Sequence, residues 1–277
     1  SGGSKGIGKF ATFVNSYFRT VFYSTKTIKG EVGYEGICKL CSGKIPGSDE
    51  VTQGIGYFGV NDKNMPILSE FNYPILEKFN LDASFVRQEI EYGTDIYILG
   101  FKGESQWREE IIVKILDSFM SAIIYEMLEI EVDNIIINKD TLKSIVYNEQ
   151  IVKAKAKPKI ISQYLLLQDR DTYVEEVEVD QLGKAKVFIR VFEGEESCFA
   201  ENKCIMIRYP YMKIKDRKIQ SLVKVGALCL IPDNKLNEKL REIENPQHTD
   251  WEFNRIEEPV IRNDFKNKIE DLYRKIN

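Results

Sequence analysis

The sequence predicts an α/β fold, in the α+β sense, divided between two domains. Apolar residues recur at helical spacing over residues 10–22 and again over 107–127. Between these two segments, the apolar run over residues 94–101 is typical of a covered β-strand. Beyond residue 150 the pattern becomes mainly β. We therefore predict a first domain over 1–150 and a β-rich second domain over 151–277.

Composition places the chain among ordinary globular proteins. It has 277 residues, of which 43% are hydrophobic and 30% charged, with a net charge of −4. No uncharged apolar run approaches the ~20 residues of a transmembrane helix, so we expect no membrane partner. The net negative charge argues against a sequence-independent coat on nucleic acid. An odd number of cysteines, five in all, indicates a reducing, cytoplasmic compartment rather than a disulfide framework.

The elements of the first domain follow from periodicity and turn signals. We expect a helix with one buried face over 10–22, then loops and small strands over 24–66. Two strands should meet at a turn formed by Gly93-Thr94. A helix of about six turns should follow from Trp107, with Ser105 as its N-cap.

A hairpin and a short helix should complete that domain. The hairpin turns at Asp133-Asn134, and the helix covers Thr141–Glu149. We interpret the basic segment Lys153–Lys159 as a linker. The second domain then reads as strands YVEEVEV, KAKVFIRVF, CIMIRYPYMKI and KVGALCLI, followed by two charged amphipathic helices.

The glycine-dense opening SGGSKGIGKF is typical of a loop whose backbone N–H groups surround phosphate oxygens. As a P-loop it would run from Gly3 to Gly8-Lys9, but Phe10 stands where a Mg²⁺-binding Ser or Thr is needed. GGSKGIG also resembles the cofactor turn of short-chain dehydrogenases. That family's Asn-Asn-Ala-Gly segment is missing, however, and repeated βαβ units are not evident.

The same stretch resembles the lid and second glycine box of Bergerat-fold ATPases, the GHKL group of gyrases, heat-shock chaperones, histidine kinases and mismatch-repair ATPases. In KGIGKFATF, the phosphate-binding residues implied by the resemblance are Gly6, Ile7, Gly8, Lys9 and Phe10. Gly93-Thr94 resembles the Gly-Thr that begins a late strand of that fold, where the hydroxyl helps to hold the network on the adenine side. The order of glycine turn, helix, long segment, Gly-Thr strand and long helix agrees with this family.

A C-terminal segment adds to the resemblance. LREIENPQHTDWEFNRI, with Leu240, Pro246, His248 and Trp251, is similar to a segment of prokaryotic GHKL-type ATPases. Some of those ATPases are encoded beside antiviral or DNA-modification genes. The resemblance therefore associates the chain with antiviral defence.

The resemblance implies a truncated Bergerat two-layer α/β sandwich, followed by a transducer-like or interaction domain. It implies ATP and Mg²⁺ as cofactors and a hydrolase activity that couples the nucleotide state to a rearrangement of domains, of a homodimer or of a protein partner. The family's catalytic Glu, Mg²⁺-binding Asn and adenine-binding Asp all precede the lid, so we assign no catalytic residue. We expect the chain to be a piece of a longer ATPase and to be inactive alone, since phosphate contacts cannot replace a general base.

Two other functions stay open. The chain could be a non-enzymatic interaction module with a degenerate nucleotide site, or an NAD(P)-dependent oxidoreductase of the short-chain dehydrogenase type. The basic and aromatic region Lys213–Lys218, preceded by Tyr209 and Tyr211, is a candidate for contacts to nucleic acid or for a transducer lysine. Cys38-x-x-Cys41 has no nearby second pair of ligands, so we assign no metal site to it.

Overall fold

The computed structural model describes residues 9–60, 64–68, 87 and 91–277, and these fall into two compact units. The N-terminal unit ends at Glu104 and the C-terminal unit comprises Ser105–Asn277. The boundary that the sequence indicated near residue 150 falls inside the C-terminal unit. None of the helices in the described part of the chain is long and apolar enough to span a bilayer.

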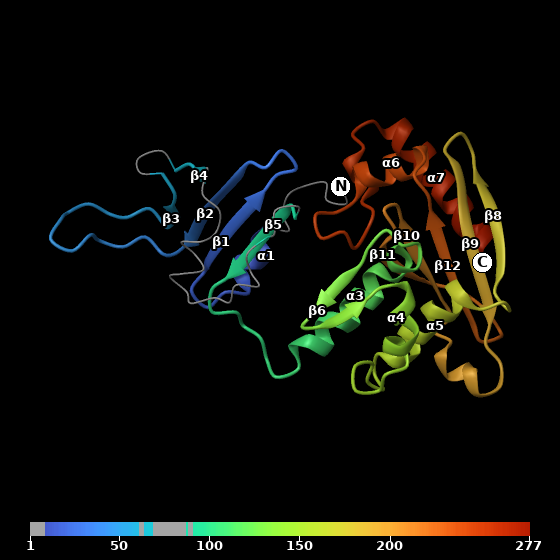
Figure 1. The fold of residues 1–277 in the computed structure, drawn as a ribbon. Helices are drawn as coiled ribbons and strands as arrows, with labels where there is room; N and C mark the ends of the chain where they lie inside the picture. Colours follow the sequence, from blue (N-terminus) through green and yellow to red (C-terminus); the bar gives the residue numbers. More distant parts are fainter. Residues whose placement is uncertain (1–8, 61–63, 69–86, 88–90) are drawn as a thin grey trace. The chain divides into compact units, whose positions relative to one another are not determined.

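The N-terminal unit is built on an antiparallel sheet of strand order β3-β2-β1-β5 (Figure 1). Its strands are β1 (Thr20–Lys26), β2 (Val32–Lys39), β3 (Ile55–Phe58), β4 (Ile67–Leu68) and β5 (Gly93–Ile98). The short β4 pairs with β2 beside β3. β1 is the central strand, because β2 and β5 pair along its two edges.

The helix expected over 10–22 is much shorter in the structure. α1 covers Lys9–Val14, and β1 begins at Thr20. Between them Arg19 adopts a left-handed φ of 51°, which turns the chain from helix into strand. The prediction was wrong because the β-branched and aromatic residues after α1 favour a strand, which has a partner on each side.

Hydrogen bonds of Ser16 stabilise this change from helix to strand. Its hydroxyl is fully buried, accepts a hydrogen bond from the Thr20 amide at 3.1 Å and donates one to the Leu99 carbonyl. A backbone bridge also joins Ser16 to Phe101. The exit of α1 is thus bonded both to the start of β1 and to the chain just after β5.

The C-terminal unit is a mixed sheet with helices on both faces (Figure 1). The strand order is β11-β10-β12-β9-β8, in which only β10 and β12 are parallel among the described strands. The strands are β8 (Tyr173–Val179), β9 (Gly183–Val191), β10 (Lys203–Arg208), β11 (Met212–Lys218) and β12 (Val225–Ile231). The mixed α/β character predicted from the sequence is confirmed.

Alternation along these strands divides the apolar side chains between two layers. One face carries Val187, Met206 and Cys229, which pack against α6 (Lys235–Ile243) and α7 (Pro259–Ile276). The other face carries Phe188 and Leu230, which pack with Leu166 of α5 (Lys157–Gln168). Short 3₁₀ turns, η2 (Gly194–Phe199) and η3 (Phe253–Arg255), complete the connections.

A helical subdomain precedes the sheet. The predicted long helix and hairpin are confirmed as α3 (Trp107–Ile124), β6 (Ile130–Val132) and β7 (Ile135–Ile137). Asp133 and Asn134 have φ values of 46° and 69°, as a tight type I′ hairpin turn requires. The predicted short helix is α4 (Lys139–Val146), capped by the Asn138 side chain. These elements share one core cluster with α5.

Two expectations for this region were wrong. The basic segment 153–159 is not a linker, because α5 begins inside it with Pro158 in its first turn, where a missing N–H costs nothing. The N-cap position of α3 is Gln106 rather than Ser105, and the Gln106 side chain makes no capping hydrogen bond. The packing of the apolar faces of α3 and α5 into a shared core determines where these helices begin, more than the local basic residues or the candidate N-cap residue do.

A buried ion pair connects the sheet to α6. Arg208, the last residue of β10, and Glu244, just after α6, both have side chains with 0% exposure. Arg208 Nε and Nη2 donate to the two Glu244 carboxylate oxygens at 2.5 and 2.7 Å. His248, whose φ is 57°, contacts the same carboxylate through Nδ1. Glu244 therefore fixes three segments of the fold to one another.

The Arg208→Met substitution should lower the free energy of unfolding by about 3–5 kcal/mol, because it leaves the Glu244 carboxylate buried without its main partner. The double substitution with Glu244→Met should recover part of that loss. Urea denaturation followed by tryptophan fluorescence measures both, since Trp107 and Trp251 belong to this unit. If Arg208→Met is as stable as the double variant, the prediction is contradicted.

Acid should weaken the same contact. Burial by itself raises the pKa of Glu244, but hydrogen bonds from Arg208 and His248 outweigh it and hold the pKa below its usual 4.5. The stabilisation is then complete above pH ~4.5 and is lost as the pH falls through the lower pKa of the folded state. We expect the melting temperature to fall below pH ~4.5, and to fall less steeply for Glu244→Gln. If the melting temperatures of the wild type and of Glu244→Gln fall equally steeply below pH ~4.5, Glu244 does not cause the loss of stability in acid.

Candidate functional site

The register of β1 determines which residues meet at one end of the N-terminal sheet. Thr25 lies opposite Gly33 of β2 and opposite Thr94 of β5. Directly opposed residues point to the same face, so the Thr25 and Thr94 hydroxyls meet at 3.0 Å. Tyr23 and Glu35, another opposed pair, lie next along the same face.

A cavity of about 960 Å³ opens beside these residues. Its lining comes from β1, β2, the hairpin between them and the segment that contains β4: Tyr23, Thr25, Thr27, Gly30, Glu31, Val32, Gly33, Tyr34, Glu35, Pro66 and Leu68. The volume is within the range of small-molecule sites, and the mixture of aromatic rings with a few polar groups is typical of them.

The charges of the cavity limit what it can hold. Glu31 and Glu35 contribute carboxylates, and the lining includes no Lys or Arg among the described residues. The Thr27 hydroxyl accepts from the Glu31 amide at 3.2 Å and donates to the Glu31 carboxylate at 3.3 Å. The lining therefore suits a neutral ring system with hydroxyl groups and disfavours phosphates.

The other end of the same face carries a cation and α1. Lys39, six residues beyond Gly33 on β2, shares its face because side chains alternate with a period of two. Lys39 Nζ lies 3.7 Å from the centre of the Phe10 ring and 4.6 Å from that of Phe13. Phe13 is only 5% exposed, so α1 packs on this end of the sheet.

The predicted glycine turn is only partly within the described structure. Gly6, Ile7 and Gly8 lie outside the described residues. Lys9 is the first residue of α1, as expected for a helix that follows the turn. Phe10 is half-exposed and lies against Lys39 rather than beside the cavity.

The Gly-Thr pair lies at the opposite end of the sheet from Phe10. Thr94 is next to Thr25 and hence next to the cavity, whereas Lys39 is about 20 Å away along β2 at ~3.4 Å per residue. The structure therefore places Phe10, a described residue of the glycine motif, against the end of the sheet opposite the Gly-Thr pair, and the two do not share a pocket. A ligand that contacts both would have to lie along the strands.

Gly93 has a backbone conformation that other residues avoid, with a φ of 147°. A Cβ atom there would come within 3.1–3.2 Å of the Arg87 guanidinium. That guanidinium makes two hydrogen bonds to the Asp95 carboxylate, at 2.6 and 3.0 Å. Glycine is thus needed for the ion pair that anchors the start of β5.

The other candidates from the sequence have structural partners. Lys213 bonds Asp117 and Asp216 at 2.9 and 2.6 Å, and Lys215 bonds Asp250 at 2.6 Å. These pairs neutralise much of the basic region that we considered for nucleic acid.

Neither the single histidine nor the cysteine pair shows a metal centre. His248 holds the Glu244 carboxylate, and Cys38 and Cys41 are free thiols. Within the residues that the structure describes, no group of three or more His, Cys, Asp or Glu side chains is arranged to hold a metal ion.

Sequence reasoning missed Thr25, Lys39 and the cavity. The β-branched and aromatic residues of TVFYSTK were the available signal for a strand that contains Tyr23 and Thr25. It was hidden because we had extended the first helix into this strand.

Gly93→Ala should lower the stability of the N-terminal unit by about 1–3 kcal/mol and should break the Arg87–Asp95 contact. Gly47→Ala is the matched control, since Gly47 also has a positive φ, of 79°, but a Cβ there meets nothing within 4 Å. Amide hydrogen exchange of β5 measures the difference. Equal protection of β5 in the two variants would contradict a special role for Gly93.

Comparison with known proteins does not assign a family. No protein-family model matches the chain, and none of the curated proteins is significantly similar to it.

Proposed function

We propose that the N-terminal unit binds an adenine nucleotide in the manner of GHKL ATPases, with the base and ribose in the cavity beside Thr25. The observation that carries the proposal is the Thr25–Thr94 hydroxyl pair at 3.0 Å, because it joins the Gly-Thr motif directly to a cavity of about 960 Å³. In the family that the sequence resembles, the hydroxyl of this motif belongs to the adenine side of the site.

The order of elements supports the same interpretation. α1, which begins at Lys9 of the predicted glycine motif, leads into β1, and β5, which opens with Gly93-Thr94, pairs with β1. The sequence predicted that order from two short motifs. The strand that follows the glycine motif and the strand that opens with Gly-Thr are therefore neighbours in one sheet.

Electrostatics favours one orientation of the nucleotide. Glu31 and Glu35 in the cavity would repel phosphates, and Glu35 lies on the same face between Thr25 and Lys39, so the phosphates would have to lie beyond Glu35, where Lys39 and the start of α1 are. The proposed nucleotide therefore lies with its base at Thr25 and its phosphates directed toward Lys39.

The proposed role is conformational. A nucleotide that binds one arrangement of the protein more tightly than another shifts the population toward that arrangement. We propose that this shift rearranges a domain, a second copy of the chain or a protein partner. We assign no catalytic base among the described residues.

The alternatives fit the geometry less well. An NAD(P) oxidoreductase of the short-chain type needs a doubly wound parallel sheet, whereas β1 pairs antiparallel with both β2 and β5. An interaction module without nucleotide agrees with exposed apolar side chains on β5 and its surroundings, such as Ile96 at 50% and Tyr92 at 63%. Binding measurements separate it from the main proposal.

Isothermal titration of the full chain with a non-hydrolysable ATP analogue and with adenosine tests the proposal. Both should bind, and Thr25→Val should weaken both by up to about tenfold, because it removes the hydroxyl that meets Thr94. Lys39→Gln should weaken only the triphosphate. These changes leave the backbone of the sheet intact.

Two control variants match these substitutions. Thr52→Val removes a hydroxyl that bonds Gly43 in a loop, and Lys44→Gln removes an exposed lysine of the same loop. Neither should change the affinity. Absence of binding by both ligands would favour the interaction module, and heat from NADPH alone would favour the oxidoreductase.

A further inference from the structure

We propose a second, independent site in the C-terminal unit: a hollow at the end of α3 that binds the base and the phosphate group of one nucleotide. It does not depend on the function proposed for the N-terminal unit. The hollow measures about 200 Å³. It is lined by Tyr125, Glu176, Lys184, Ala185, Lys186, Tyr211, Leu230 and Pro232.

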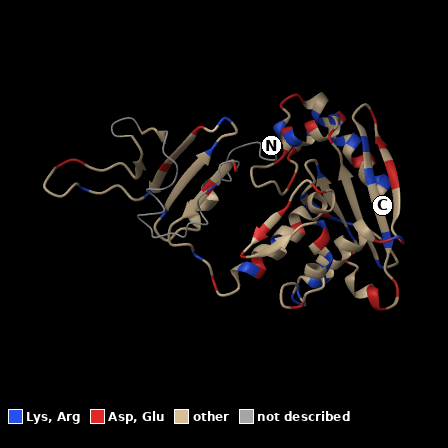
Figure 2. Cartoon of the chain, viewed as in Figure 1, with Lys and Arg blue, Asp and Glu red and all other residues tan. Residues whose placement is uncertain are grey.

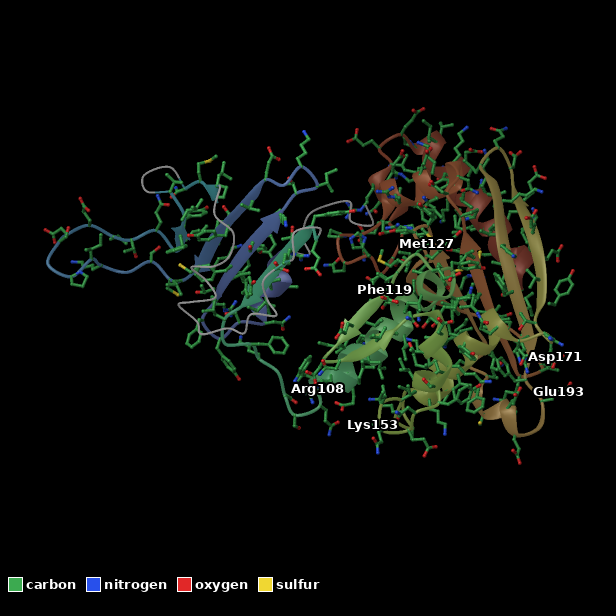
Figure 3. The ribbon with its side chains drawn as sticks, in the orientation of Figure 1. Arg108, Phe119, Met127, Lys153, Asp171 and Glu193 are labelled. Atoms are coloured by element: carbon green, nitrogen blue, oxygen red, sulfur yellow. The ribbon has the colours of Figure 1, made fainter. Side chains whose placement is uncertain are left out.

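Two tyrosines form its aromatic wall. Tyr125 directly follows the last residue of α3, two residues before Met127, which is labelled in Figure 3. Tyr211 lies in the turn between β10 and β11, and the centres of the two rings are 4.9 Å apart. Tyr209 supports Tyr211 edge-on, with ring centres 5.7 Å apart. Tyr125 is 39% exposed, so its ring is available for stacking.

The backbone at Tyr211 is unusual for an aromatic residue. Its φ is 65°, in the left-handed region where a residue with a Cβ is disfavoured by roughly 1 kcal/mol. Glycine or asparagine would occupy such a turn at lower cost. Strained positions of this kind gather at binding sites. The presence of tyrosine at this position therefore indicates that its ring has a role beyond forming the turn.

The charges of the hollow favour an anion. Glu176 is paired with Lys184 at 3.0 Å, and Figure 2 shows the acidic side of β8 beside the basic side of β9. Lys186 Nζ lies 5.3 Å from the Phe188 ring, and no carboxylate of the described residues is within ion-pair distance of it. The lining thus carries one surplus positive charge. A cationic ligand among the tyrosines would be repelled by Lys186.

The tyrosine hydroxyls can donate to a ligand. Burial raises the pKa of Tyr125, and the neighbouring Tyr211 raises it further. Burial also raises the pKa of Tyr211, together with Tyr209 and Asp233, which lies outside the lining. Both hydroxyls therefore stay protonated at neutral pH.

The size of the hollow limits the ligand to one ring system with its substituent, since sites for whole small molecules occupy about 300–1,000 Å³. Leu230 and Pro232 give it an apolar base. Stacking on an aromatic ring and one lysine contact to a phosphate are the two elements of single-stranded nucleic-acid recognition. A free mononucleotide presents the same chemistry, so the two sources must be separated by experiment.

Fluorescence-monitored titration of the full chain with AMP and, separately, with a short oligothymidylate tests the site. Tyr211→Gly removes the ring while glycine accepts the positive φ, so the fold should be kept, and binding should weaken about tenfold. Lys186→Gln should weaken binding and, for the oligonucleotide, should reduce the slope of log K against log salt by about 0.7. Circular dichroism checks that both variants are folded.

Two substitutions outside the hollow serve as matched controls. Tyr173→Ala removes an exposed tyrosine of β8, and Lys143→Gln removes an exposed lysine of α4. Both should bind like the wild type. Tighter binding of the oligonucleotide assigns the site to single strands, and tighter binding of AMP assigns it to free nucleotides.

Two results would overturn the proposal. One is that neither probe binds. The other is that Tyr211→Gly and Lys186→Gln bind the probes as tightly as the wild type. If only Thr25→Val weakens the binding, the signal belongs to the cavity of the N-terminal unit, and the proposal is likewise overturned. Failure of adenosine at that cavity leaves the present test unaffected, since the variants lie in different units.

Discussion

The pairing of β1 with two neighbours is the constraint from which the features of the N-terminal unit follow. In an antiparallel sheet, a shift of one residue would move every side chain of the strand to the opposite face. With the observed register, the Thr25 hydroxyl faces Thr94 and the cavity, while Phe22 and Ser24 belong to the other face. Gly36 leaves room for the Phe22 ring there, because a Cβ atom would lie 2.6 Å from it.

In the C-terminal unit, paired charges limit where chemistry can occur. Asp117 of α3 receives Lys213 of β11 and Lys159 of α5 at 2.9 and 2.8 Å, which joins both helices to the sheet. Arg190 is held in the same manner by Asp169 and Glu196, each at 2.8 Å. Lys213 and Lys215 of the basic cluster are therefore held in structural ion pairs, whereas Lys186 lies on a different strand, β9.

Much of the fold could be predicted from periodicity. Strands β8, β9 and β12, the hairpin at Asp133-Asn134 and the terminal helices appear where the alternation and turn residues placed them. The segment CIMIRYPYMKI, predicted as one strand, is instead the two antiparallel strands β10 and β11, because the chain turns at Tyr211, whose φ is 65°. Segments whose residues fit both a helical pattern and a strand pattern were harder to predict. Residues 17–22 continue the helical spacing of α1, but their β-branched and aromatic side chains find strand partners, and this tertiary pairing decides the conformation.

The sites were less predictable than the fold. Gly93-Thr94 could be identified as a motif, but its partner Thr25 depends on a register that no local pattern specifies. Lys186 and Tyr211 are distant in sequence and meet only because β9 and the turn after β10 belong to one sheet. The basic segment 153–159 was misjudged because its charges indicated a linker, while the buried Ile160 and Ile161 just after it extend the helix.

The buried hydroxyl of Ser16 has a structural consequence. It bonds the start of the central strand β1, at the Thr20 amide, and the segment directly after β5, at the Leu99 carbonyl. These two hydrogen bonds connect the end of the short helix to the C-terminal end of the Gly-Thr strand. Loss of this one hydroxyl would therefore remove a side-chain partner from two strands at once.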